Sequence, residues 1–126
     1  MKLRLVVAVA LILLAVGWGA FCLLRLDRAA DGMAAAIETA MAAADQQSPD
    51  WAPATEEIQR LWRRQRPFLH TLLPHVNLNE LEWALGALPE YLEQGDRNLY
   101  IEQCVRALQC VNTLREMERP TLGNIF

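Results

Sequence analysis

The chain has 126 residues, 12 of them basic and 15 acidic, which gives a formal net charge of −3. An acidic chain is a poor candidate for a nucleic-acid-binding protein, which needs a clustered basic surface, so we expect no nucleic-acid partner. Three cysteines do not make a disulfide framework, and the length suits a single domain.

The first predicted element is an apolar run from Leu5 to Leu24 that contains no charged residue. As a helix, a run of this length extends about 30 Å, close to the thickness of the hydrocarbon core of a bilayer. We therefore predict a membrane-spanning helix, with Leu14 and Trp18 inside it, and contact with membrane lipid. Residues 1–25 are interpreted as the membrane anchor.

The anchor is expected to stay on the protein. Its apolar run exceeds the 7–15 residues of a secretory signal, and no small-residue cleavage site follows it directly. Lys2 and Arg4 ahead of the span, against Arg25 and Arg28 after it, slightly favour an N-terminus inside the cell. We predict a single-pass cell-membrane protein with an extracytoplasmic C-terminal domain. The alternatives are the opposite orientation and a secreted protein released by cleavage.

Residues 26–126 are predicted to form a helical bundle domain. The first helix is expected to continue out of the membrane to about Gln46, because small and apolar residues recur every three or four positions. That stripe consists of Leu26, Ala30, Met33, Ile37, Ala40 and Ala44.

A second helix is predicted to begin near Ser48, a favoured N-cap, with Pro49 in the first helical position. Pro67 should kink this helix, since it removes one backbone hydrogen bond, and Pro74 marks its end. Its apolar stripe consists of Trp51, Ile58, Trp62 and Leu69.

The third helix is predicted to begin at Asn77, which has capping-box spacing to Glu80. Pro89 predicts a bend, and Gly95 occupies the position of a left-handed C-terminal cap. The expected buried stripe consists of Leu78, Leu81, Leu85, Leu88 and Leu92.

Asp96 is predicted to cap a fourth helix that stops before Pro120, with the tail Thr121–Phe126 packing back on the bundle. The stripe of this helix consists of Ile101, Cys104, Val105, Leu108, Val111 and Leu114.

No segment alternates with a period of two, so strands are not expected. Short connections favour antiparallel neighbours. The predicted fold is therefore all-α: an N-terminal transmembrane helix continuing into a small antiparallel three- to four-helix bundle. Cys104 and Cys110 lie six residues apart on one helix, roughly 9 Å between Cα atoms, so they cannot form a disulfide and are read as buried thiols.

Catalytic motifs are not found in the sequence. The only histidines, His70 and His75, point in different directions even on one helix, and no metal-binding spacing, phosphate-binding loop or nucleophile motif accompanies them. We expect no enzyme activity, no cofactor and no metal.

The most polarised segment is the basic run Arg60, Arg63, Arg64 and Arg66. It is interpreted either as a solvated surface, with Glu56 paired to Arg60, or as a contact for lipid head groups or an acidic partner. With His75 and Trp83 it forms the predicted interaction patch. Trp83 is alternatively a packing residue.

Several short motifs occur together along the chain: the N-terminal anchor, Asp50-Trp51, Trp62, an acid-rich helix start from His75 to Glu80, Gly95-Asp96 and a terminal L-x-N-I-F at Leu122 to Phe126. This pattern resembles domain-of-unknown-function family 4363, small single-span helical membrane proteins of Gram-positive bacteria. The resemblance implies a membrane-anchored protein that works with a multispan membrane partner. It implies no activity and no catalytic residues.

Two functions fit these predictions. The first is a structural or adaptor module that binds another envelope or membrane protein, through an exposed patch beside Trp83, Tyr91 or Tyr100. The second is an extracytoplasmic small-ligand or ion sensor that uses the bundle core near His75, which predicts a concave pocket lined by carboxylates.

Overall fold

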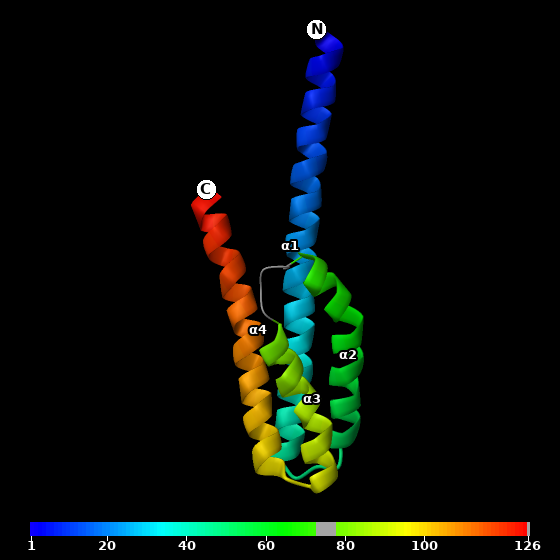
Figure 1. Ribbon diagram of the computed structural model, residues 1–126, viewed down its shortest axis with the longest axis vertical. Helices are drawn as coiled ribbons and strands as arrows, with labels where there is room; N and C mark the ends of the chain where they lie inside the picture. The colour runs from blue at the N-terminus through cyan, green and yellow to red at the C-terminus, as the bar shows by residue number, and fades with distance from the viewer. Residues whose placement is uncertain (73–77, 126) are drawn as a thin grey trace.

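The computed structural model describes residues 1–72 and 78–125, with side chains as far as Glu116. Within these residues the chain is helical and contains no strand (Figure 1). Four helices follow one another along the chain: α1 (Lys2–Asp45), α2 (Trp51–Leu72), α3 (Asn79–Gln94) and α4 (Arg97–Ile125). The all-α prediction is confirmed, with four helices rather than three.

The helices alternate in direction and form an antiparallel bundle (Figure 1). Helix α1 packs along both α2 and α4, and α3 packs along α4, whereas α2 and α3 make the fewest contacts of any neighbouring pair. The bundle is therefore closed on three sides and loosest on the side where α2 and α3 meet.

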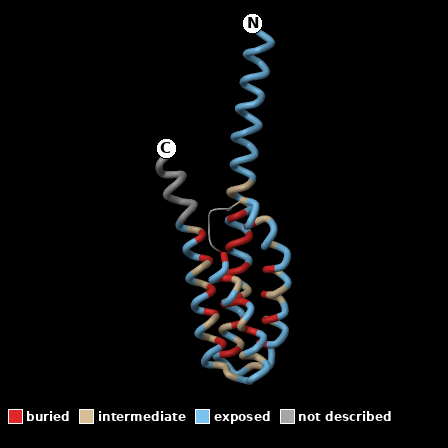
Figure 2. The backbone as a smooth tube through the Cα atoms, in the orientation of Figure 1, coloured by how far each residue is buried: buried red, intermediate tan, exposed pale blue. Residues whose placement is uncertain are grey.

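Helix α1 is much longer than the bundle needs. Its N-terminal half projects alone from one end (Figures 1 and 2), and the C-terminal end of α4 points the same way (Figure 1). The predicted span residues Leu5, Leu14, Trp18 and Leu24 are all exposed, and the first buried residue of α1 is Leu26. Among the described residues, α1 is the one helix long and apolar enough to cross a membrane.

Most of the bundle core consists of the stripes predicted from the sequence. Every predicted member on α1 and α2 is buried, as are four of the five on α3. Many core positions of α1 are alanines, and these allow α2 and α4 to approach its backbone closely. Figure 2 shows the buried residues facing inward on all four helices.

Helix α4 departs from its predicted stripe in two places. Val105 is 42 % exposed, whereas Tyr100, expected on the surface, is fully buried. The buried face of α4 is thus rotated toward Tyr100 and Ala107. A tyrosine can occupy this core because its hydroxyl finds a hydrogen-bond partner there.

The turn between α3 and α4 follows the prediction. Gly95 is left-handed, with φ of 71°, and the Asp96 carboxylate accepts a hydrogen bond from the Leu99 N–H at 3.2 Å. These two residues end one helix and begin the next, so the chain reverses within a very short connection.

Three helix ends differ from the predicted positions. Helix α2 begins at Trp51, because the Ser48 hydroxyl accepts the N–H of Asp50 at 3.2 Å and holds an extra turn ahead of the helix. Helix α4 continues through Pro120 to Ile125, so the separate tail was wrong. A proline removes one backbone hydrogen bond and crowds the carbonyl four residues earlier, which favours a bend, but here the helix runs past it. Helix α3 begins at Asn79 with Leu78 at the N-cap position, later than predicted, and the predicted cap Asn77 lies outside the described residues.

Candidate functional site

Polar contacts join α2 to α3 at Gln59 and at Arg66. The Gln59 amide nitrogen donates to the Leu85 carbonyl oxygen at 2.6 Å, and the Arg66 guanidinium lies 3.2 Å from the Glu82 carboxylate. Residues three, four or seven apart share one side of a helix, so these contacts identify the facing residues of both helices. We call them the α2–α3 face: Glu56, Gln59, Arg63 and Arg66 of α2, with Glu82, Gly86, Pro89 and Glu93 of α3.

The Gln59 contact exists because of Pro89. In a regular helix, the N–H of residue 89 would donate to the carbonyl of Leu85, but proline has no N–H. The orphaned carbonyl needs another donor, and Gln59 supplies it from the neighbouring helix. A break in the hydrogen bonding of α3 therefore becomes a tie between α2 and α3.

Away from the Gln59 contact, the side chains of this face keep α2 and α3 from packing closely. Gly86 and Pro89 offer no long side chain toward α2, and a Cβ placed on Gly86 would meet nothing within 4 Å. Polar side chains occupy the positions where an apolar contact would draw the helices together. The result is an open groove rather than a packed interface.

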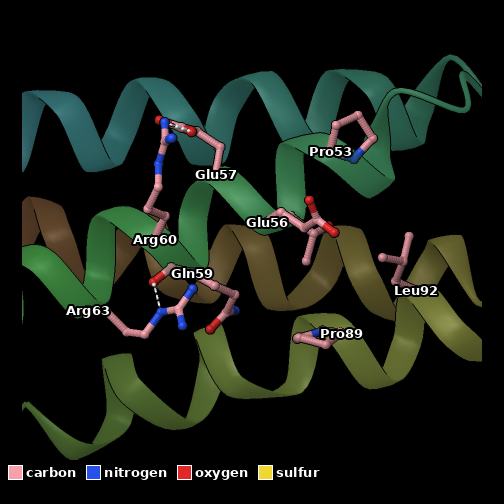
Figure 3. Close-up of a pocket in the computed structure, with 9 residues that line it drawn as sticks. Pro53, Glu56, Glu57, Gln59, Arg60, Arg63, Pro89 and Leu92 are labelled. Carbon is pink, nitrogen blue, oxygen red and sulfur yellow. Dashed lines mark hydrogen bonds and ion pairs between the residues drawn. The ribbon is translucent and has the colours of Figure 1, made fainter.

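This groove has a volume of about 550 Å³ (Figure 3). Its volume falls within the range of small-molecule sites, but such sites are lined mainly by apolar side chains and enclose their ligand. Charged and polar side chains predominate here. The lining consists of Pro53, Thr55, Glu56, Glu57, Gln59, Arg60, Arg63, Pro89 and Leu92.

All four arginines of the predicted patch are exposed on α2. Arg60 forms an ion pair with Glu57, one turn away, rather than with Glu56 as expected. Arg63 Nε donates to the Gln59 carbonyl at 3.4 Å. Arg60 and Arg63 both line the groove, with Arg60 turned toward Glu57 (Figure 3), whereas Arg64 and Arg66 do not line it.

Trp83 is 74 % exposed and lies on α3 directly after Glu82. Its neighbours Leu81, Ala84 and Leu85 are buried, so its ring points away from the core. Single exposed apolar residues are common on protein surfaces, and an exposed indole is available for contact with a partner. Trp83 is therefore not a core packing residue, and its place in the interaction patch stays a prediction.

His75, the remaining member of the predicted patch, lies outside the described residues. The sensor alternative was centred on this histidine. Within residues 1–72 and 78–116, no three His, Cys, Asp or Glu side chains are grouped as metal ligands would be.

A buried aromatic network lies at the end of the bundle away from the apolar half of α1. The Thr55 hydroxyl donates to the Trp51 carbonyl at 2.6 Å, so the Tyr100 hydroxyl, 2.5 Å from Thr55, is left as the donor in their contact. The Trp51 ring meets the Tyr100 ring edge-on and the Arg97 guanidinium, 4.2 Å from its centroid, on its face. Burial raises the pKa of Tyr100 to about 12. The Tyr100 hydroxyl therefore stays protonated and keeps its hydrogen bond to Thr55, so this network stabilises the fold.

The cysteines outside the apolar run are free, as predicted. Burial raises the pKa of Cys104 to about 12 and also raises the pKa of the half-buried Cys110. Thiols with raised pKa values are poor nucleophiles because the thiolate is scarce. These side chains therefore belong to the packing of α4.

The chain was compared with known proteins. The model of a family described as "Domain of unknown function (DUF4363)" matches residues 21–125. No curated protein and no solved structure matches the chain. The family match covers most of the chain and the whole bundle, so the chain belongs to this family.

Proposed function

We propose that this member of the DUF4363 family is a membrane-anchored adaptor. The N-terminal half of α1 holds it in the cell membrane as a single-pass anchor, and the bundle is extracytoplasmic. The α2–α3 face binds another membrane or envelope protein, and its role is binding rather than catalysis.

The anchoring part of the proposal is supported by the shape of α1. A helix with an exposed apolar half is stable in water only if something covers that half, and a bilayer does so along its whole length. The buried half of the same helix forms the core of the bundle. An anchor continuous with the core fixes the bundle's distance from the membrane.

The observation that carries the binding part is the open α2–α3 face. The other three contacts between neighbouring helices are closely packed, whereas this one leaves a groove lined by Arg63. Trp83 of α3 does not line the groove but is exposed on the same helix. Protein interfaces are enriched in Trp and Arg. A mixed polar and apolar groove suits a protein segment better than a small apolar ligand.

The test is site-specific photo-cross-linking in intact cells. A photoreactive amino acid replaces Arg63 or Trp83 in the full chain, and the exposed Glu102 on α4 provides the matched control. We expect discrete cross-links to one membrane protein from the first two positions and none from Glu102. Equal labelling from all three positions, or only lipid adducts, would remove the adaptor role.

Topology is measured on the same full-length chain. A C-terminal reporter that is active only outside the cytoplasm should be active, and the chain should fractionate with membranes at its full mass. An inactive reporter would place the bundle in the cytoplasm and redirect the partner search there. A shortened soluble product would instead indicate cleavage of the anchor.

A further inference from the structure

The α2–α3 face has opposite charges at its two ends. The start of α2 and the end of α3 lie at the end of the bundle away from the apolar half of α1 (Figure 1). Glu56 lies there, and Glu93, one turn beyond Pro89, lies on the same side of α3. Arg63 and Arg66 lie nearer the apolar half of α1. Arg66 is already paired with Glu82 of α3, so Arg63 is the uncompensated charge at that end. The face is therefore acidic far from the predicted membrane and carries Arg63 as its uncompensated basic charge closer to it.

The helix dipole of α2 does not account for this arrangement. Its effect is confined to the first and last turns of a helix, whereas Arg63 lies nine residues before the end of α2. Core packing does not account for it either, since Glu56 and Arg63 are both exposed. The charge order is thus a property of the surface.

This order argues against pairing between two copies. Two chains anchored in one membrane point the same way, so a twofold axis between them runs along the membrane normal. Joined through the α2–α3 face, they would set Arg63 against Arg63 and Glu56 against Glu56. Like charges at an interface are repulsive and exclude wrong partners.

We infer that the groove is occupied by a helical segment of a different membrane protein, with acidic side chains near the membrane and basic side chains farther out. The inference rests on the proposed function and specifies its partner. Acidic residues of that segment meet Arg63, and basic residues meet Glu56 and Glu93. The segment's apolar side contacts Pro89 and Leu92, which line the groove.

The test uses two synthetic peptides with one common membrane-spanning helix. Each continues into a helix long enough to reach Glu56, either with Glu near the membrane and Lys beyond it or in the reverse order. Binding to the full-length chain, carrying a C-terminal fluorescent tag, is measured by energy transfer in phosphatidylcholine vesicles. We expect the first peptide to bind on the order of five- to tenfold more tightly.

The chain supplies a matched pair of variants. The double variant Glu56→Lys/Arg63→Glu should reverse the preference, whereas Glu102→Lys/Arg106→Glu, which makes the same exchange on α4, should leave it unchanged. Thermal melting checks that both remain folded. Three results would each overturn the inference. The first is equal binding of the two peptides, and the second is a preference that survives the first exchange. The third is energy transfer between two wild-type copies that is lost on substituting Arg63. Cross-links to another protein would still support the adaptor, so the two failures are distinguishable.

Discussion

The tie between Gln59 and the Leu85 carbonyl can be tested with a double-mutant cycle. Gln59→Leu removes the donor while keeping the size of the side chain. The carbonyl that Pro89 leaves without an N–H then loses its partner in a partly buried position. A lost hydrogen bond together with an unsatisfied carbonyl should lower the free energy of unfolding by about 1–2 kcal/mol.

The second arm of the cycle is Pro89→Ala. Alanine restores an N–H that can donate to the Leu85 carbonyl within α3, so the carbonyl no longer depends on Gln59. In this background Gln59→Leu should cost less than about 0.5 kcal/mol, which gives a coupling of about 1 kcal/mol. The effect of Pro89→Ala alone on stability cancels from the comparison.

The assay is denaturation of the full-length chain in detergent micelles, followed by the fluorescence of the buried Trp51 and Trp62. For a domain of this size, about 1 kcal/mol shifts the melting temperature by about 4–8 °C. If Gln59→Leu has the same cost in the wild-type chain and in the Pro89→Ala variant, the carbonyl does not depend on Gln59, and the explanation given for the α2–α3 tie is wrong.

Three further predictions concern the bundle. Burial raises the pKa values of Tyr100 and Cys104 to about 12, above their ordinary 10.0 and 9.0. The unfolded chain therefore loses these protons at lower pH than the folded chain. The contribution of these groups to stability should be complete below about pH 9 and fall as the pH rises toward 12. Tyr100→Phe/Cys104→Ala should flatten this alkaline decline in melts taken across pH, and an unchanged decline would contradict the assignment. Trp62→Ala should lower the free energy of unfolding, measured with denaturant, by about 3–5 kcal/mol. Trp83→Ala should change it by less than about 0.5 kcal/mol and weaken only cross-linking. Similar losses of stability in the two variants would contradict the burial of Trp62 and the exposure of Trp83. Asp96→Ala should cost about 1 kcal/mol in the same unfolding measurement by removing the cap of α4, and Asp96→Asn should retain most of it.

Much of the architecture could be predicted from local pattern. The stripes on α1 and α2 follow from helical periodicity, and the Gly95-Asp96 turn follows from the backbone preference of glycine and the capping ability of aspartate. Helix boundaries were predicted less well. Pro120 predicts a stop, because a proline removes one hydrogen bond and crowds the carbonyl four residues earlier, but the hydrogen bonds of neighbouring residues can sustain a helix through it.

The candidate site was predicted only in part. The exposed arginines were identified because a dense run of charge cannot be buried. The role of Gln59 was missed, although one signal was available: Pro89 implies an unpaired carbonyl four residues earlier, which must find a donor elsewhere. Which residue supplies that donor is a question of helix pairing, and sequence spacing within one helix does not answer it.

The sequence by itself determined the long apolar N-terminal helix, the number and order of the other helices and most of their buried positions, because each depends on residues close together in the chain. Only the tertiary structure decided that α2 and α3 form the loosest contact, that Tyr100 is buried against Thr55 and Trp51, and that Arg63 lines a groove while Trp83 faces outward. These features depend on how each helix is rotated against its neighbours. Rotation is set by the simultaneous packing of all four helices, which no single helix encodes.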